Sequence, residues 1–338
     1  FLRDANYFVT SAETGQGISE LRHYLANLPE LADTQKPFRY AIDRVFSVKG
    51  AGTVVTGTAF SGTVKVNDEI YLSTGQKVRV KAIHAQNTSS EQGIAGQRLA
   101  LNLNADLDRT PMKRGDWLLQ DEPLSPTDRI SVQILAEVPL NESQPVHIYH
   151  GASRTTGKLT LLQGKNAAKN DRTLAEIILD SPLFLAFGDK LILRSGDAKS
   201  LIAGARVLEI DSPKRHKRTE GRLSFLANLA LAENAAQRIA FILQHNAISA
   251  HKLMWIEQLT NKQLDDALTE RSAVRYQDWC FNTDYKKEKI QLILTALNTY
   301  HEQHNDQLGV SKARLYRMAA LNQPENLINH FIDEMLED

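Results

Sequence analysis

The chain has 338 residues, a length typical of two or three domains. Its 40 basic residues balance its 40 acidic residues, so it is not a bulk polycation that binds nucleic acid by net charge alone. Hydrophobic residues make up 42% of the chain, which excludes a disordered or fibrous protein. No apolar run approaches the roughly 18 residues of a membrane-spanning helix, so we expect no membrane partner.

The compartment is indicated by the cysteine content and by the start of the chain. Cys280 is the only cysteine, which excludes a disulfide framework and a zinc site built from cysteines. No signal peptide is visible, so we expect a cytoplasmic protein. Because the chain starts at Phe1 and within a structural element, we interpret it as a fragment of a longer protein.

Residues 1–36 predict one strand–loop–helix unit. Tyr7–Thr10 has the pattern of a short buried strand, and Ser11–Gly17 is a turn-rich loop. Apolar residues then recur at helical spacing from Ile18 until Pro29 ends the segment. The unit is too short to be a domain, so we expect it to be the remnant of an α/β domain that lies upstream.

Residues 37–123 predict a small antiparallel β-barrel. The period of the apolar residues changes to two in Val78–His84, and Thr53–Thr58 is a β-branched run bounded by glycines. Gly50 and Gly52 form a Gly-x-Gly that opens no helix, so it is not a dinucleotide-binding fingerprint. We interpret it as a tight turn between two strands.

A second barrel of similar size is predicted over residues 127–213. Pro123 and Pro126 mark the boundary before it. Its predicted strands include Ile130–Val138 and Leu201–Leu208.

Residues 214–283 predict an exposed basic linker, Lys214–Arg218, followed by a winged helix. After the linker glycine becomes rare and the apolar period becomes helical. Three short helices and a two-stranded wing within about 60 residues are typical of a winged-helix module. The predicted elements are the helices Ala235–His245, His251–Leu259 and Asn261–Thr269 and the wing Val274–Phe281.

Residues 284–338 predict a second winged helix that stops before its wing. Tyr285–His301 is its long first helix, Ser311 can cap the second, and Pro324 stands at the first turn of the third. The predicted fold class is therefore multidomain. Two antiparallel β-barrels are followed by α-rich winged-helix modules, with a short α/β remnant at the start.

No residue pattern in this chain predicts catalysis or a metal site. There is no Gly-x-x-x-x-Gly-Lys-Ser/Thr loop, nucleophile triad or spaced carboxylate pair, so we expect no catalytic residue and no nucleotide hydrolysis by this chain alone. His147 and His150 have opposite parity on a predicted strand, so they do not easily share an ion. His301 and His304 lie one helical turn apart but have no obvious third ligand.

The order of the predicted modules resembles the translational GTPases of the elongation factor Tu class, in which a GTP-binding domain precedes two β-barrels. Val9–Ala12 resembles the last nucleotide-binding motif of such a GTP-binding domain. Val48–Thr58 and Ala95–Arg98 resemble the second domain of these proteins, and Leu191–Arg194 and Ala203–Ala205 the end of the third.

The winged helices narrow the resemblance, because elongation factor Tu itself ends after its second barrel. Within the class, that extension is similar to the selenocysteine-specific elongation factors, which Ala41–Arg44, His84–Asn87 and Thr299–His304 also resemble. The resemblance implies a GTP-dependent factor, a GTPase when complete, that carries selenocysteyl-tRNA to the ribosome at recoded UGA codons.

The resemblance also implies which ligands this chain meets. GTP and magnesium are bound by the GTP-binding domain, of which Ser11 and Ala12 here match the guanine-contacting motif. No cofactor is expected in this fragment itself. The hairpin of the mRNA is gripped by winged helices that lie beyond this chain, so we expect the fragment to bind it poorly. A monomer is expected.

The aminoacyl pocket of the family lies in the first barrel and maps onto Asp43, Arg44 and Arg98, with His84 as a weaker candidate. A selenol is ionised near neutral pH whereas a serine hydroxyl is not, so a fixed positive charge can tell them apart. Asp43 is expected to orient an arginine or to accept from the aminoacyl amine. The alternative for both arginines is a surface ion pair.

Two further groups of side chains are candidates for contacts with RNA. His150, Arg154 and Lys158 are placed by position to touch tRNA phosphates, and solvated strand positions are the alternative. Trp255, Tyr276 and Trp279 have the chemistry to stack on bases, but packing between modules is the favoured interpretation.

Two other functions stay open at this point. The chain could belong to a winged-helix regulator that binds nucleic acid and has no GTPase activity, which leaves the two barrels unexplained. It could also belong to another tRNA-delivery GTPase of the elongation factor Tu class, which would lack tandem winged helices.

Overall fold

A computed structural model describes residues 6–28, 33–48, 52–244, 246–304, 307, 309–320 and 322–337. The chain divides into two compact units, Phe1–Glu122 and Pro123–Asp338, and each is described by itself. Pro29, the predicted turn at Gly50 and the predicted helix end at His245 lie outside the described residues. Across the described ranges, no helix has the length and apolar character needed to cross a membrane.

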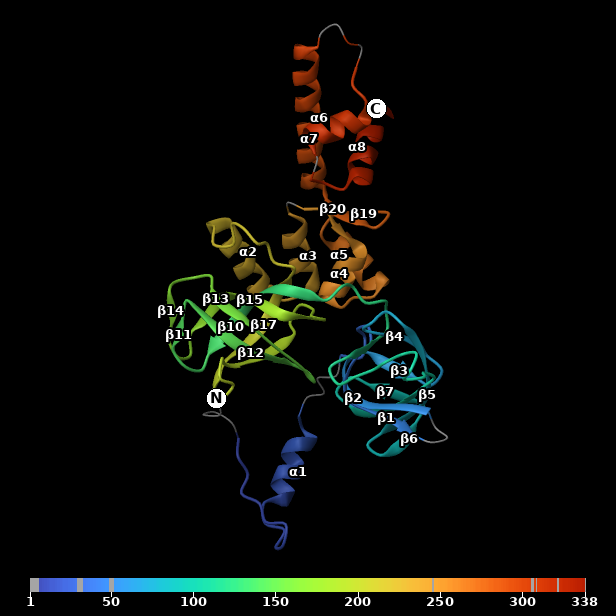
Figure 1. Ribbon diagram of the computed structural model, residues 1–338, viewed down its shortest axis with the longest axis vertical. Coiled ribbons are helices and arrows are strands. Elements are labelled where there is room, and N and C mark those ends of the chain that lie inside the picture. The colour runs from blue at the N-terminus through green and yellow to red at the C-terminus, as the bar shows by residue number, and fades with distance from the viewer. Residues whose placement is uncertain are drawn as a thin grey trace. The chain divides into compact units, whose positions relative to one another are not determined.

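The start of the first unit contains helix α1 (Ile18–Ala26), as predicted (Figure 1). Gly17 precedes it with a φ of +69°, and an added Cβ there would lie 2.1 Å from the carbonyl oxygen of Val9, so only glycine fits. The predicted strand at Tyr7–Thr10 is wrong for this structure. No described segment pairs with it, and Tyr7 and Val9 are 88% and 75% exposed. A strand without a neighbour has no ladder to join.

The first unit is otherwise an antiparallel barrel, which confirms the predicted architecture. Six strands close in the order β4-β9-β1-β2-β8-β5, with β5 paired back to β4. These strands are β1 (Arg39–Val48), β2 (Gly52–Ser61), β4 (Glu69–Leu72), β5 (Lys77–Ala85), β8 (Arg98–Leu103) and β9 (Trp117–Leu119). The short strands β3 (Thr63–Lys65) and β7 (Gln92–Ile94) pair with each other, and β6 (Thr88–Ser90) extends the edge at β5.

A β-bulge interrupts β1 where it pairs with β2. Ile42 pairs with Gly57 and Arg44 pairs with Thr56, so Asp43 is an extra residue with no partner of its own. The two strands approach so closely that a Cβ on Gly57 would lie 2.0 Å from the carbonyl oxygen of Ala41. Glycine at this position is therefore a condition for the bulge.

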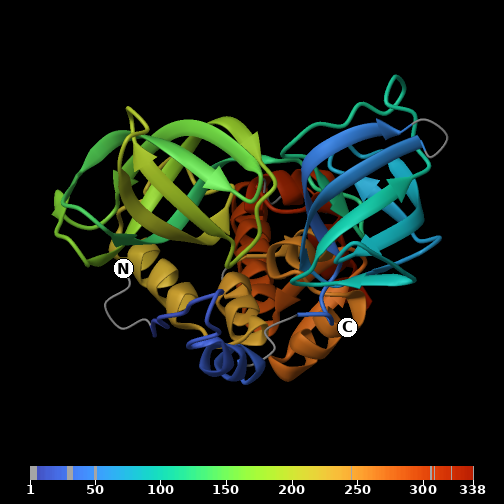
Figure 2. The same ribbon diagram turned by 90° about the horizontal axis from the view of Figure 1, so that it is seen from below.

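The second unit begins with another closed antiparallel barrel, as predicted (Figure 2). Its strand order is β10-β15-β13-β12-β16-β17, and β17 pairs back with β10. The strands are β10 (Thr127–Ala136), β12 (Ser143–His150), β13 (Ser153–Leu161), β15 (Arg172–Leu183), β16 (Lys190–Ser195) and β17 (Leu201–Ile210). The short strands β11 (Leu140–Asn141) and β14 (Asn166–Ala167) pair beside it.

The basic segment after the second barrel, Lys214–Arg218, is exposed as predicted except at Lys217, which is half-buried. It leads into helix α2 (Glu220–Leu231), which the sequence analysis missed. Leu226 and Leu229 of α2 pack on Leu162 and Leu208 of the barrel. Lys214 is exposed as predicted.

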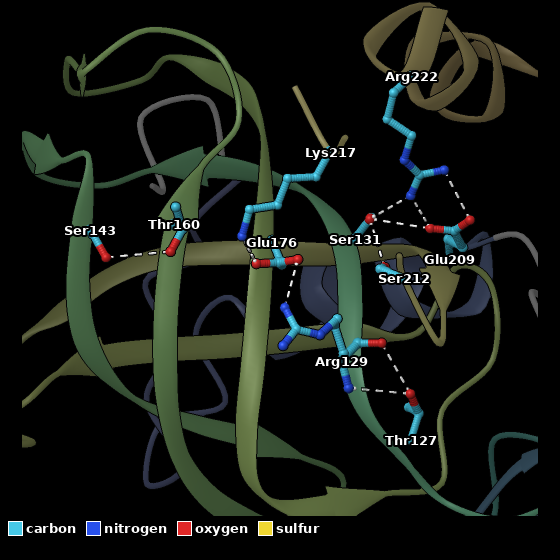
Figure 3. Close-up of polar contacts among 10 residues, drawn as sticks. All are labelled: Thr127, Arg129, Ser131, Ser143, Thr160, Glu176, Glu209, Ser212, Lys217 and Arg222. Carbon is cyan, nitrogen blue, oxygen red and sulfur yellow. Dashed lines mark hydrogen bonds and ion pairs between the residues drawn. The ribbon is translucent and has the colours of Figure 1, made fainter. Parts of the chain in front are cut away.

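Lys217 of this segment and Arg129 of the barrel both bind Glu176, whose side chain is only 2% exposed (Figure 3). Arg129 Nη1 donates to Glu176 Oε1 at 3.0 Å. Nearby, Arg222 of α2 forms an ion pair with Glu209. These basic side chains therefore hold the start of the helical region on the barrel.

A winged helix follows, with its three helices and wing in the predicted order. A three-stranded sheet in the order β18-β20-β19 completes it. The elements are α3 (Ala235–Leu243), β18 (Ile248–Ser249), α4 (Ala250–Glu257), α5 (Asn261–Glu270), β19 (Ala273–Tyr276) and β20 (Trp279–Asn282). The module docks on the second barrel, where Trp255 Nε1 donates to the carbonyl oxygen of Leu185 at 2.9 Å.

The remaining helices match the predicted second winged helix. They are α6 (Thr283–Gln303), α7 (Lys312–Ala319) and α8 (Glu325–Glu337). Ser311 caps α7 by accepting from the backbone N–H of Arg314, as predicted. Because α6 begins at the residue after β20, no linker separates the two modules.

The close approach at the bulge can be tested by Gly57→Ala. The added methyl group meets a backbone oxygen that cannot move aside, so we expect the first barrel to lose about 2–3 kcal/mol of stability. Hydrogen exchange in peptides covering β1 and β2 measures the loss. Gly204→Ala in β17 is the control, because nothing lies within 4 Å of its added Cβ. Equal protection in Gly57→Ala and the parent chain would contradict the argument.

The buried cluster around Glu176 can be tested by Glu176→Gln. Removal of the charge leaves Arg129 and Lys217 without their counter-ion, so we expect a loss of about 3 kcal/mol in urea unfolding. Glu142→Gln is the control. Glu142 and its partner Arg218 have side chains 40% and 44% exposed, so that change costs less than about 1 kcal/mol. Equal effects of the two substitutions would show that burial of the Glu176 charge is unimportant.

Candidate functional site

The bulge in β1 turns two charged side chains to the outer face of the first barrel. Strand alternation would place Asp43 outside and Arg44 inside. Because of the extra residue, both lie outside, while Ile42 is buried and Val45 packs against the core on the other face. An acid and an arginine that adjoin in sequence therefore stand on the same surface.

Asp43 is held by side chains from two neighbouring strands. Arg98, at the start of β8, binds its carboxylate with two nitrogens, and Nη2 donates to Oδ1 at 3.1 Å. Thr56 Oγ1 of β2 donates to the same Oδ1 at 2.8 Å. We call Asp43, Thr56 and Arg98 the Asp43 cluster. Its arginine side chain is 57% exposed and its aspartate 23% exposed, so the cluster remains open to a ligand.

The charges of this cluster perturb the titration of its members. Partial burial works against ionisation of Asp43, but hydrogen bonds from Arg98 and Thr56 and the positive charges of Arg98 and Arg44 hold its pKa below the usual value. The hydrogen bond to Asp43 raises the pKa of Arg98 against the opposing effect of partial desolvation. Beneath the cluster, burial raises the pKa of Tyr40, which keeps its phenol neutral.

The other two predicted pocket residues lie on the same outer face. Arg44 pairs with Thr56 across the ladder, Thr56 with Ala100, and Ala100 with His84 of β5, so one register row joins them. Neither Arg44 nor His84 forms an ion pair or side-chain hydrogen bond with another described residue. The structure thus brings the four predicted pocket residues to one surface, and Arg44 has no ion pair among the described residues.

The loop at Ser11 and Ala12 is folded on itself. Ser11 Oγ accepts from the N–H of Thr14 at 3.2 Å, and the N–H of Ser11 donates to the carbonyl of Gln16 at 3.0 Å. The backbone N–H of Ala12 has no hydrogen-bond partner in the described part of the chain. It is therefore open to an acceptor supplied by a ligand.

The three predicted phosphate contacts in the second barrel do not share a surface. Arg154 and Lys158 point outward from β13 and are exposed. His150 is 2% exposed, and its Nε2 lies 3.4 Å from Asp189 Oδ2 inside the barrel. Burial removes its ring from any surface that a phosphate can reach, so we leave His150 out of the proposed contacts.

The aromatic side chains of the winged helices are used for packing, which the sequence analysis favoured over base stacking. Trp255 is buried against the barrel. Trp279 Nε1 donates to Asn326 Oδ1 of α8 at 3.0 Å. The ring of Tyr276 stacks on that of His330, with centroids 3.7 Å apart. The wing of the first module is therefore covered by the second.

The third helix of the first winged helix, α5, is acidic on its exposed side. In nucleic-acid-binding modules of this kind that helix enters the groove and approaches phosphates. Here it exposes Asp265, Asp266 and Glu270 against one lysine, Lys262, and Arg275 of the wing pairs with Asp265 at 3.5 Å. Acidic side chains therefore outnumber basic ones on the exposed side of α5, which weakens its attraction for a phosphate backbone.

Sequence reasoning missed two members of the site. Thr56 lay within a β-branched run that predicted a strand and nothing more. Tyr40, whose hydroxyl donates to the carbonyl of Leu99 at 2.9 Å beneath the cluster, had only the pattern of a core residue. The one available signal was Gly57 in the middle of a strand, which is typical of a bulge.

Three protein-family models match this chain, one in each barrel and one in the last helices. The model described as elongation factor Tu domain 2 matches residues 52–119. The model described as the selenocysteine-specific elongation factor β-barrel domain matches residues 127–214. The model described as the elongation factor SelB winged helix matches residues 294–338. The chain is therefore a multidomain protein of the elongation factor Tu class.

Individual relatives narrow this class to one family. All 338 residues are 90% identical to the selenocysteine-specific elongation factor of Haemophilus influenzae, of which the chain covers 55%. Over 336 residues it is 40% identical to that of Escherichia coli, covering 99% of this chain and 53% of the relative. The chain belongs to the selenocysteine-specific elongation factor family, and it spans about half the length of the curated relatives it matches.

Solved structures agree with the fold. A crystal structure titled bacterial selenocysteine-specific elongation factor EF-Sec matches with a TM-score of 0.72 and 23% identity, over 96% of this chain and 52% of that one. The apo structure of SelB from Methanococcus maripaludis matches with a TM-score of 0.51 and 25% identity, over 61% of this chain and 50% of that one.

The lowered pKa of Asp43 gives a pH prediction. Because the folded-state pKa lies below the unfolded one, the cluster stabilises the barrel fully above about pH 4, and this stabilisation is lost as pH falls through the folded-state value. In Arg98→Ala we expect the pKa of Asp43 to rise, measured by carboxyl-carbon NMR. The change in stability is less than about 1 kcal/mol, because the pair is exposed. An unchanged pKa would contradict the pairing.

Proposed function

We propose that the chain is the part of a selenocysteine-specific elongation factor that holds the selenocysteyl end of the tRNA. The observation that carries this proposal is the convergence of Asp43, Arg44, Arg98 and His84 on one outer face of the first barrel. Family membership supports it independently, since the relatives carry that name.

The chemistry of the cluster suits an aminoacyl group that bears both an amine and a selenolate. Arg44 offers a permanent positive charge to the selenolate, and a guanidinium stays protonated at any physiological pH. Asp43 offers a carboxylate that stays ionised, to which an ammonium group can bind. His84 lies in the same register row and completes the surface.

Selection against seryl-tRNA follows from the same charges. A serine hydroxyl is uncharged and close in size to a selenol, so the volume of a pocket separates them poorly. An arginine that loses water and gains only a hydroxyl is left without a counter-ion, which costs free energy. The positive charge therefore disfavours serine at the site as well as attracting the selenolate.

The remaining parts of the proposal concern the whole factor. Ser11 and Ala12 end a GTP-binding domain and contact guanine, with GTP and magnesium held by that domain, which makes the complete protein a GTPase. The free N–H of Ala12 supports this role. Arg154 and Lys158 contact tRNA phosphates, and their exposure supports it. The ribosome and the mRNA hairpin are the other partners, and the factor acts in the cytoplasm.

The alternative of a winged-helix regulator is disfavoured by the charge of α5. A module that reads nucleic acid through this helix needs cations on it, and α5 exposes three acidic residues, Asp265, Asp266 and Glu270, against one lysine, Lys262. This balance of charge disfavours the binding of nucleic acid through α5.

The proposal is tested with the full-length factor and GTP. We expect it to protect selenocysteyl-tRNA against ester hydrolysis more strongly than seryl-tRNA. Arg44→Ala and Arg98→Ala are each expected to weaken this preference about tenfold, the equivalent of about 1.4 kcal/mol. Arg79→Ala is the control, because Arg79 pairs with Glu69 in an exposed ion pair on the same barrel.

The outcomes separate the candidate functions. Equal protection of both aminoacyl-tRNAs keeps a tRNA-delivery factor of the elongation factor Tu class but removes the selenocysteine assignment. Protection of neither favours the winged-helix regulator. A loss in Arg79→Ala as large as in Arg44→Ala assigns the effect to general charge instead of the pocket.

A further inference from the structure

We propose that Thr56 is a positioning residue of the aminoacyl site: its hydroxyl decides which of two neighbouring arginines Asp43 binds. The inference rests on the proposed function and adds a residue that the family resemblance did not mark. It follows from the hydrogen bonds of the Asp43 cluster and from the place of Thr56 on the barrel.

Thr56 is the most firmly fixed member of the cluster. It lies on β2, which pairs with β1 on one side and β8 on the other, so its backbone is held from both sides. A β-branched side chain has few rotamers. Asp43 sits on a bulge, and Arg98 has a long side chain that is 57% exposed. Of the three, Thr56 alone combines a backbone paired on both sides with a short branched side chain.

The hydroxyl closes a ring of hydrogen bonds. Thr56 Oγ1 donates to Asp43 Oδ1 at 2.8 Å, and its lone pair faces Arg98 Nη2 at 3.5 Å. Arg98 Nη2 donates to the same Oδ1 at 3.1 Å, and Nη1 binds Oδ2. The hydroxyl proton thus fixes the rotation of the carboxylate so that its two oxygens face both nitrogens of Arg98.

Without this bond Asp43 has a second positive partner within reach. Arg44 is the next residue, lies on the same face, and its charge already acts on the carboxylate. A carboxylate free to rotate divides between the two arginines. With Thr56 in place it binds Arg98, and Arg44 keeps its charge for the ligand. Thr56 therefore acts through Asp43 and is not itself a ligand-binding group.

The test compares Thr56→Val, which keeps the shape and loses the hydroxyl, with Thr56→Ser, which keeps the hydroxyl. In the full-length factor with GTP, Thr56→Val is expected to weaken selenocysteyl-tRNA binding about fivefold, the usual effect of one such hydrogen bond, and seryl-tRNA binding much less. Thr56→Ser is expected to bind selenocysteyl-tRNA as the parent factor does. Thr58→Val is the matched control, since Thr58 is exposed on the same strand opposite Arg98 but donates to no carboxylate among the described residues.

A second readout is independent of tRNA. Carboxyl-carbon NMR of this chain is expected to show a higher pKa for Asp43 in Thr56→Val than in the parent chain, and a recovered one in Thr56→Ser. The inference is overturned if Thr56→Val changes neither the binding of selenocysteyl-tRNA nor the pKa of Asp43. Equal weakening of both aminoacyl-tRNAs without rescue by serine also overturns it, because that pattern is a general structural defect.

Failure of the proposed function gives a different pattern. There the parent factor itself does not prefer selenocysteyl-tRNA, whatever residue occupies position 56. The pKa of Asp43 then still tests whether Thr56 positions the carboxylate. A higher pKa in Thr56→Val supports this role, and an unchanged pKa overturns it.

Discussion

The candidate site depends on a single constraint, the missing side chain at Gly57. Any Cβ there meets the carbonyl of Ala41, so only glycine allows β1 and β2 to approach where Asp43 is inserted. The inserted residue shifts the alternation of the strand and brings Arg44 to the outer face beside Asp43. Without the bulge, one of the two charges would point into the barrel, where an unpaired arginine is costly. The geometry of the site is thus set by backbone packing before any charge is considered.

The second unit is held together by a comparable match between its barrel and the chain that follows it. On the outer face, Ser131 of β10 pairs with Glu176 on one side and Glu209 on the other, which places two carboxylates in one row. Lys217 and Arg222 cover this row and neutralise it. Lys217 of the basic segment and Arg222 of α2 therefore hold the barrel and the helices together. Lys214 and Arg215 of the same segment are exposed.

The features that could be predicted from the sequence depend on local periodicity or on the order of the modules along the chain. Both barrels, the three helices and wing of the first winged helix and the cap at Ser311 were predictable because each leaves a pattern within a few residues. The strand at residues 7–10 failed because pairing depends on a partner elsewhere. Helix α2 was missed because it depends on which outer surface of the barrel is covered, and the burial of His150 because it depends on which face of β12 turns inward. Thr56 was missed for a similar reason, since only strand register brings it to Asp43.

The exposure of the Asp43 cluster bears on how charge can select a ligand. Two unit charges 4 Å apart attract by about 1 kcal/mol in water but by about 4 kcal/mol at the effective dielectric constant of a partly covered protein surface. In the free protein the arginine side chain of the cluster is 57% exposed, so its field is weak. A ligand bound at this face itself has to exclude the water that weakens the field. A side chain that fixes Asp43 beforehand is then needed, because the charges have to stand in their final arrangement when the dielectric constant falls. Thr56, whose strand is paired on both sides, supplies that order at a surface where water would otherwise allow many arrangements.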